Sequence, residues 1–354
     1  MILLVLCGGL VNGAFTLKQD TWIAILFMGV LYLPMILIYS RICRLFPGKG
    51  LFDIIEAVSG RTGNVVFVLI ITFYALFVSG LVLQNYTEFT VVISLQQTPY
   101  IPIMILILLA SLYLAAKGPK LLGRWSFIIC ILIIGHFILT VILSLDIMKP
   151  GYVLPAMDHS FKEIVHNSHA VGCIAVGEAL MVLTLFGAVK KEQRAFKILL
   201  PGILIGVGMF ALIILRNLFV LGPALEQEAQ FSTYMTARII KVGSFLERVE
   251  SSISINYILI GVTKLTLLLM AASMGIARLF KSVHYKKFLM PTGILTLAIS
   301  TMVFKNVMEM YDFVWVYSYL SILFQVVVPL IIWITAEIKA RRNRRDITGL
   351  HNMT

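Results

Sequence analysis

Two ionisable residues of opposite charge stand inside long apolar segments of this 354-residue sequence. Glu178 lies in AVGCIAVGEALMVLTLFGAV, residues 170–189, and Lys264 lies in INYILIGVTKLTLLLMAASMG, residues 255–275. A charge deep in an apolar phase costs from about 2.5 to over 10 kcal/mol, so such residues usually mark a pathway or a binding site. We expect the two to form an ion pair, or one of them to neutralise a charge on a ligand. The alternative is that Lys264 snorkels to an interface while Glu178 is protonated among packed side chains.

The composition places these charges inside a membrane. Hydrophobic residues make up 60% of the sequence and charged residues only 13%, against roughly a quarter charged in soluble domains. This balance indicates a polytopic membrane protein embedded in a lipid bilayer. The net charge of +12 does not indicate nucleic acid, because the basic residues fall in short clusters between apolar runs rather than on one polar face.

A window of about 19 residues predicts ten membrane-spanning helices and hence an all-α fold. The ten apolar segments lie near 1–16, 22–40, 64–90, 101–116, 126–146, 170–189, 199–221, 254–280, 289–304 and 313–337.

The connections between these segments alternate in basic residues, which predicts their orientation. Nineteen Lys and Arg residues fall in one alternating set of connections and in the C-terminal segment, and seven fall in the other set. Basic residues favour the cytoplasmic side of a membrane, so we expect both termini to be cytoplasmic. Glu178 and Lys264 then lie about eight and ten residues from the outer ends of their spans, near the middle of the bilayer.

Ten spans divide into two halves of five, at about 1–146 and 170–338, in a single transmembrane domain over 1–340 followed by a basic cytoplasmic tail at 341–354. Because five is odd, the second half enters from the opposite side, which is the inverted-repeat plan of many transporters. In that plan the first helix of each half is broken near the midplane. Clustered glycines favour such breaks, and they occur at Gly8, Gly9 and Gly13 beside Asn12, and at Gly172, Gly177 and Gly187. Close helix packing, as at Gly9 and Gly13 and at Gly202 and Gly206, is the competing interpretation.

The first segment is short for a span. Its sixteen residues before Leu17 cover about 24 Å as a helix, less than the 30 Å core of a bilayer. We therefore expect either that half of the first helix is missing or that Met1 is internal to a longer protein.

Other polar residues suggest supporting roles. Arg216 lies about five residues from the outer end of its span and is interpreted as an interfacial anchor, and His136 as a packing residue. Asn85 and Glu88 are expected to line an outer vestibule. The segment 50–60 has the pattern of a short amphipathic surface helix, and 226–252 that of a helical outer connection.

Enzymatic and metal chemistry find no support in the sequence. It has no HExxH, Walker A or GxSxG motif, and its four cysteines have neither CxxC spacing nor histidines at ligand spacing. We therefore predict no catalytic residues, no metal site and no cofactor.

Several strings resemble one family, the B subunits of bacterial spore germinant receptors. They are KQDTWIA at 18–24, LFPGKGLFDII at 45–55, FLERVESS at 245–252 and TKLTLLLMAASMGIARLF at 263–280. The likeness runs through almost the whole chain in order and spacing. It implies the inverted-repeat fold of the amino acid, polyamine and organocation transporters.

The resemblance also implies a function. Such a subunit lies in the spore inner membrane, binds a small germinant, typically an amino acid, and acts with A and C subunits to trigger germination. By analogy with the transporters, the ligand would contact Gly8, Gly9, Asn12, Gly177 and Glu178, with Lys264 as a further partner for Glu178. An active amino acid permease is the alternative, because sensing and transport can share one site.

Overall fold

The computed structural model describes residues 1–8, 16–188, 195–240, 249–304 and 307–351, and every regular element within them is helical. In the first half these are α1 (Ile2–Leu6), η2 (Lys18–Asp20), α2 (Thr21–Leu31), α3 (Leu33–Leu45), α4 (Leu51–Val58), α5 (Arg61–Ile93), α6 (Tyr100–Lys117), α7 (Pro119–Ser144), η3 (Leu145–Ile147) and η4 (Pro150–Val153). In the second half they are α8 (Phe161–Gly172), η5 (Cys173–Gly177), α9 (Ala179–Val182), η6 (Leu183–Ala188), α10 (Ala195–Glu228), α11 (Ser232–Ile239), α12 (Val249–Leu279), η7 (Tyr285–Phe288), α13 (Leu289–Val303), α14 (Val307–Ile322), η8 (Leu323–Val327) and α15 (Val328–His351).

Among the described residues, eight helical stretches are long and apolar enough to cross a membrane. They are Lys18–Leu45, Thr62–Ile93, Tyr100–Lys117, Pro119–Ile147, Phe161–Ala188, Ala195–Glu228, Ser251–Leu279 and Glu309–Arg341. Each matches one of the ten predicted segments. The other two predicted segments correspond to α1 and α13, which have five and fifteen residues.

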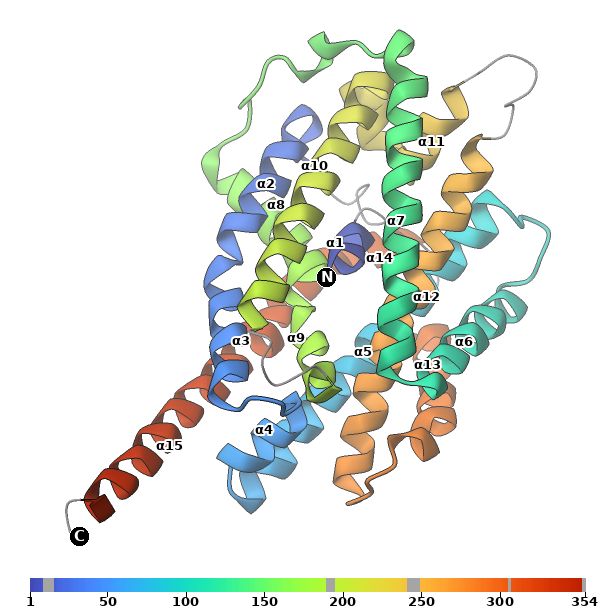
Figure 1. Ribbon diagram of the computed structural model, residues 1–354. Helices are drawn as coiled ribbons and strands as arrows, with labels where there is room; N and C mark the ends of the chain where they lie inside the picture. The colour runs from blue at the N-terminus through green and yellow to red at the C-terminus, as the bar shows by residue number, and fades with distance from the viewer. Residues whose placement is uncertain (9–15, 189–194, 241–248, 305–306, 352–354) are drawn as a thin grey trace.

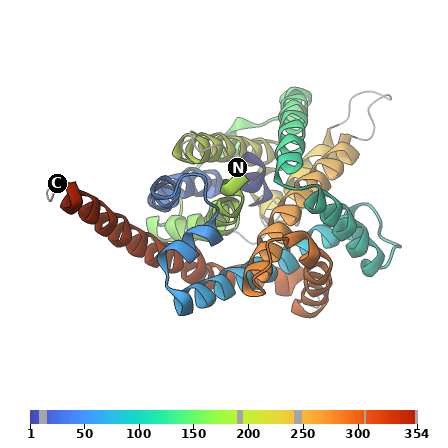
Figure 2. The same cartoon turned by 60° about the horizontal axis from the view of Figure 1, so that its bottom comes forward.

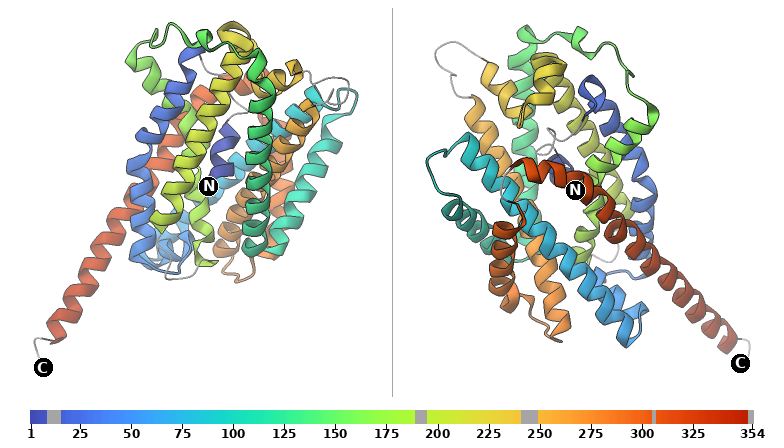
Figure 3. Two further views of the ribbon diagram at one scale, coloured as in Figure 1. Left: turned by 45° about the horizontal axis from the view of Figure 1, so that its top comes forward. Right: turned by 180° about the vertical axis from the view of Figure 1, so that it is seen from behind.

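The spans with Glu178 and Lys264 form the centre of the bundle. In Phe161–Ala188 and Ser251–Leu279, 78% and 83% of the most apolar window is buried within the protein, whereas in Pro119–Ile147 the share is 22%. Helix α12 packs most extensively against α5, and α2 packs against α8. Figures 1 and 3 show α1 enclosed by this bundle, with the N-terminus inside it. The two charged residues therefore come from the two most enclosed spans.

The sixth span is a broken helix, as predicted. It begins with a capping box, in which the Ser160 hydroxyl accepts from the Glu163 amide and the Glu163 carboxylate accepts from the Ser160 amide. Helix α8 then passes into a π-helix, η5, and Glu178 lies in a turn between η5 and α9. Single-turn π-helices are frequent at functional sites, and here the carbonyl oxygens of Cys173 and Ile174 accept hydrogen bonds from side chains in the middle of the protein.

The counterpart break in the first span is only partly described. Gly8 follows α1 in a short 3-10 turn, while Gly9, Asn12 and Gly13 lie outside the described residues. Helix α1 packs closely on α10, where a Cβ at Gly206 would be 2.8 Å from Val5 Cβ and one at Gly202 would be 2.6 Å from Met1 Cβ. The packing interpretation is therefore right for the pair Gly202 and Gly206.

Both peripheral segments that were predicted to be helical contain a helix. The segment 50–60 contains the amphipathic helix α4, which buries Leu51, Phe52, Ile54 and Ile55, and the connection 226–252 contains α11. Helix α15 projects from the bundle and remains helical to His351 (Figure 2), so the basic segment after residue 340 continues the last span as a helix.

Candidate ligand-binding site

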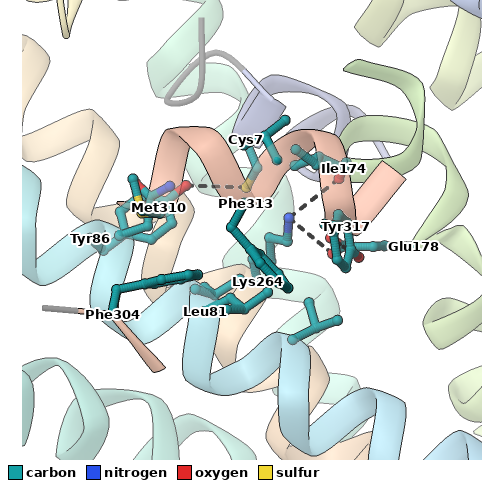
Figure 4. Close-up of a pocket in the computed structure, with 14 residues that line it drawn as sticks. Cys7, Leu81, Tyr86, Ile174, Glu178, Lys264, Phe304, Met310, Phe313 and Tyr317 are labelled. Carbon is teal, nitrogen blue, oxygen red and sulfur yellow. Dashed lines mark hydrogen bonds and ion pairs between the residues drawn. The ribbon is translucent and has the colours of Figure 1, made fainter. Parts of the chain in front are cut away.

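Glu178 and Lys264 form an ion pair inside the bundle. Lys264 Nζ lies 2.9 Å from Glu178 Oε2, and their side chains are 3% and 2% exposed, respectively. Lys264 Nζ also donates to the backbone oxygen of Ile174 at 3.4 Å, and Figure 4 shows both contacts converging on the ammonium group. The predicted pair is therefore present, and the snorkelling interpretation of Lys264 is wrong.

Side chains from other helices satisfy the carbonyl groups of the broken helix. The Gln325 amide donates to the oxygen of Cys173 at 2.7 Å, and the Tyr39 hydroxyl lies 3.5 Å from the oxygen of Gly177. Together with the bond from Lys264 to Ile174, these contacts hold the π-helix in its irregular shape. An unsatisfied buried carbonyl costs free energy, so the contacts fix the position of the turn that carries Glu178.

A chain of hydrogen bonds connects Glu178 to α5 and to the last span. The Tyr317 hydroxyl donates to Glu178 Oε1 at 3.4 Å and lies 2.8 Å from the Tyr74 hydroxyl. The side-chain amide of Gln325 donates to the Tyr74 hydroxyl at 2.6 Å. The Tyr39 hydroxyl donates to the backbone oxygen of Gln325 at 2.6 Å. Gln325 lies in η8, a second π-helix. All four residues are at most 4% exposed, so this network orients the carboxylate from one side.

Sequence reasoning missed these four network residues. Tyrosine is common in membrane proteins, and Tyr39, Tyr74 and Tyr317 carry no spacing that marks them as a group. Gln325 carries the one available signal, an amide in the middle of the apolar segment 313–337. A strongly polar residue at that depth indicates a buried hydrogen-bonded site.

The ion pair lines a pocket with a volume of about 60 Å³. Its polar groups come from Asn85, Tyr86, Tyr317 and the charged pair, and apolar side chains form the rest. Figure 4 shows the lining residues Cys7, Leu81, Tyr86, Ile174, Glu178, Lys264, Phe304, Met310, Phe313 and Tyr317. The pocket thus combines one positive and one negative group with an apolar wall.

Of the other residues predicted from the sequence, Asn85 lines this pocket, and Gly8, Gly177 and Glu88 make contacts elsewhere. Gly177 lies directly before Glu178 and packs on Gln325. At Gly8 a Cβ would be 3.1 Å from Ala175 Cβ, so Gly8 packs α1 onto η5. Asn85 lines the pocket, whereas Glu88 accepts a hydrogen bond from the Tyr100 hydroxyl at 3.2 Å.

A second and larger cavity also reaches Lys264. It has a volume of about 490 Å³ and is lined by Met1, Lys120, Ser126 and Thr263 among others. The lining of this second cavity includes Leu267, which lies beyond Lys264 on α12 in the direction of Arg278. The lining of the first pocket instead includes Phe304 and Met310. Lys264 therefore lies between two cavities that extend in different directions.

The interpretation of Arg216 as an interfacial anchor is wrong. Its side chain is buried, at 3% exposed, and donates to the Thr140 hydroxyl at 2.8 Å and to Asn217 Oδ1 at 2.6 Å. The helical backbone is interrupted at Gly222, soon after Arg216, so the side chain is enclosed by its neighbours although it lies near the end of its span. His136 is half-buried, with Nε2 3.5 Å from the Ser252 hydroxyl.

No metal site accompanies this arrangement in the part of the chain that the structure describes. Within it, no group of three or more His, Cys, Asp or Glu side chains is placed to hold a metal ion.

The architecture is that of an all-helical polytopic membrane protein with a broken central span. The fold is similar to the crystal structure of MhsT in complex with L-phenylalanine, with a TM-score of 0.62 over 95% of this chain and 98% of that chain, at 13% sequence identity. This likeness agrees with the inverted-repeat fold expected from the charge pattern.

The sequence identifies the family within that architecture. Residues 4–309 match the Spore_permease family model, described as spore germination protein, and the chain belongs to this family. Two proteins of Bacillus subtilis (strain 168) are similar along most of their length. Spore germination protein KB is 24% identical over 93% of this chain and 89% of its own, and the putative spore germination protein YfkT is 22% identical over 91% and 88%.

Proposed function

We propose that this protein is the membrane subunit of a nutrient germinant receptor and that it binds an amino-acid-like germinant at Glu178 and Lys264. The observation that carries the proposal is a buried pair of opposite charges at a helix break, facing a pocket, in a chain of the spore germination protein family. A free amino acid carries the complementary pair, an ammonium and a carboxylate.

The charged groups have unused capacity for such a ligand. An ammonium group has three N–H donors; that of Lys264 donates to the oxygen of Ile174 and lies 2.9 Å from Glu178 Oε2. A donor is available to a ligand carboxylate, and Glu178 Oε2, which accepts no hydrogen bond from the described residues, is available to a ligand ammonium. Because each buried charge exchanges one counter-charge for another, ligand entry avoids leaving either one uncompensated.

The rest of the pocket favours an apolar side chain on the ligand. Phe304, Met310, Phe313 and Val314 line it together with Leu81. Burial of apolar surface supplies roughly 25 cal/mol per Å², whereas a polar side chain would lose its hydration against these residues. We therefore propose aliphatic or aromatic amino acids as the ligand class.

The assembly and location follow from the family resemblance and the charge pattern. We propose that the protein works with A and C subunits in the spore inner membrane, with both termini cytoplasmic. The transmembrane domain extends over 1–340, with its two halves at about 1–146 and 170–338. Gly8, Gly9, Asn12 and Gly177 are proposed as further contacts, through backbone groups near the helix breaks.

An active amino acid permease is the second candidate. The observation that favours it is the position of Lys264 between two cavities, since alternating access requires one site that is reachable from both sides in turn. The purified protein in liposomes, without other subunits, would accumulate a radiolabelled amino acid if it were a permease. A receptor subunit would bind the amino acid without accumulating it.

Ligand stabilisation of the purified protein tests the binding proposal. A ligand that binds only the folded state raises the melting temperature in a concentration-dependent way. We expect this for some apolar L-amino acids, and not for their methyl esters or deaminated acids, which each lack one charge.

Glu178→Gln should abolish this response, while Glu88→Gln should preserve it, because Glu88 is also buried but lies outside the pocket lining. Equal responses in the two variants would contradict the proposed site.

A further inference from the structure

Arg216 presents a buried positive charge that the described residues do not neutralise. Its side chain is 3% exposed, and both of its hydrogen-bond acceptors, the Thr140 hydroxyl and the Asn217 amide oxygen, are uncharged. Its Nε has no acceptor, and no carboxylate lies within ion-pair distance of the guanidinium, among the residues that the structure describes. A guanidinium stays protonated in proteins, so burial cannot neutralise it as it can a lysine.

The guanidinium lies at the edge of a pocket that suits an anion. The pocket has a volume of about 60 Å³ and lies between α7, α10, α11 and α12, with Leu6 of α1 also in its lining. Its polar lining consists of donors or uncharged groups, namely His136, Thr140, Arg216, Thr233, Asn256 and Tyr257. Within the described part of the chain, this lining contains no Asp or Glu.

Neighbouring residues hold the arginine in place. Asn217 Nδ2 donates to the hydroxyls of Ser232 and Thr233, at 3.2 and 2.9 Å, and this fixes its carbonyl oxygen toward Arg216. Helix α11, which supplies both hydroxyls, thus closes one side of the pocket. Neutral groups therefore hold the Arg216 guanidinium in position without neutralising its positive charge, which remains available to an anion.

We propose that this pocket binds a small monovalent anion, either a halide or the carboxylate of a small organic acid, against Arg216. Burying an unpaired charge carries a large desolvation penalty, and a bound anion removes it. Arginine forms strong charge-assisted hydrogen bonds with such anions, and with carboxylates these are often bidentate.

The anion site is separate from the Glu178 and Lys264 pocket but shares helix α12 with it. Asn256, Ile260 and Lys264 follow one another at intervals of four on α12, so they share a face. Asn256 and Lys264 are about 12 Å apart along the axis. The two pockets also share α1, through Leu6 and Cys7. The proposal does not depend on which ligand, if any, binds at Glu178.

Anion-dependent melting of the full-length purified protein tests the site. The protein is kept at constant ionic strength in sodium gluconate, whose anion is bulky, and chloride, bromide or formate is titrated in. We expect a saturating rise of several degrees in Tm, because an anion that binds only the folded state stabilises it. A response to both halides alone identifies an inorganic anion, and a response to formate alone identifies a carboxylate.

Three variants assign the response to the pocket. Arg216→Met should remove it, and Arg216→Lys should shift its midpoint to higher anion concentration. Arg238→Met should preserve it, since Arg238 is an exposed arginine on the adjacent α11 and controls for general salt effects.

Equilibrium dialysis of the wild-type protein with radiolabelled chloride or formate keeps the test independent of variant folding. About one bound anion per chain supports the site. Either of two results would overturn it: the wild-type protein shows no saturable response to any of the three anions, or Arg216→Met responds as the wild type does.

Discussion

The side-chain amide of Gln325 occupies the space that a side chain at Gly177 would need. A Cβ at residue 177 would lie 1.7 Å from Gln325 Oε1 and 2.3 Å from Cδ, far inside van der Waals contact. Gln325 cannot move aside freely, because its amide nitrogen donates to both Tyr74 and Cys173. The helix break in the sixth span therefore fits the π-helix of the last span only because residue 177 is glycine.

We therefore expect Gly177→Ala to destabilise the protein and to impair ligand binding. Overpacking a tight site costs roughly 1–3 kcal/mol, and relief here requires Gln325 or the turn at Glu178 to shift. The measurement is Tm together with ligand-induced stabilisation. Gly208→Ala is the matched control, since a Cβ at Gly208 meets nothing within 4 Å. Similar losses in the two variants would show that the contact between Gly177 and Gln325 is unimportant.

The Glu178 and Lys264 charges should behave as a unit in stability measurements. Removing one partner of a buried pair leaves the other uncompensated and typically costs about 3–5 kcal/mol, whereas replacing both is often far less damaging. We expect Glu178→Gln and Lys264→Met each to lower Tm strongly and the double variant to recover part of the loss. Strictly additive changes would mean that the two side chains do not interact energetically.

Sequence alone predicted these two residues because a charge is conspicuous in an apolar segment and helical depth can be counted. The sequence predicts similar depths in the membrane for Glu178 and Lys264, which carry opposite charges, and in the structure the two side chains form an ion pair. The residues around them were not predicted, because Tyr74, Tyr317 and Gln325 are uncharged and lie on spans whose facing cannot be read from all-apolar periodicity. Their roles arise only when three spans meet at the break.

The network around Glu178 can be tested at Tyr317. Tyr317→Phe removes the donor to Glu178 Oε1 and the partner of the Tyr74 hydroxyl, and one buried hydrogen bond is worth about 1 kcal/mol. We expect a modest fall in Tm and a several-fold weaker ligand affinity, as the carboxylate loses its orientation. Tyr319→Phe on the same helix is the control, because Tyr319 is 62% exposed and bonds to His166. A loss of affinity in both variants would point to a general effect on α14.

The error at Arg216 shows where depth counting fails to predict exposure. The apolar run ends five residues after Arg216 in the sequence, at Leu221, and the helix is interrupted next to it by the non-helical backbone of Gly222, so the counted position is right and the inferred exposure is wrong. Hydropathy measures where apolar residues stop, whereas burial depends on which helices pack around a position. Here α7, α11 and α12 enclose the arginine, and no local pattern around residue 216 reveals them.

Arg278 at the end of α12 is expected to hold the surface helix α4 against the bundle. It forms ion pairs with Asp53 and Glu56 of α4, and α4 in turn touches the end of the broken span, where a Cβ at Gly50 would lie 2.8 Å from the oxygen of Thr184. The Arg278 side chain is 40% exposed, and exposed ion pairs contribute at most about 1 kcal/mol. Arg278→Gln should therefore barely change Tm.

Its effect should instead be local. Hydrogen exchange reports the opening of individual segments, and we expect amide exchange across 51–58 to accelerate several-fold in Arg278→Gln. Arg41→Gln removes a similarly exposed ion pair, to Glu337, and should leave exchange in α4 close to that of the wild type. Faster exchange throughout the chain would mean that Arg278 supports the whole bundle. Unchanged exchange in α4 would mean that the buried face of the helix, with Leu51 and Ile55, is sufficient to hold it.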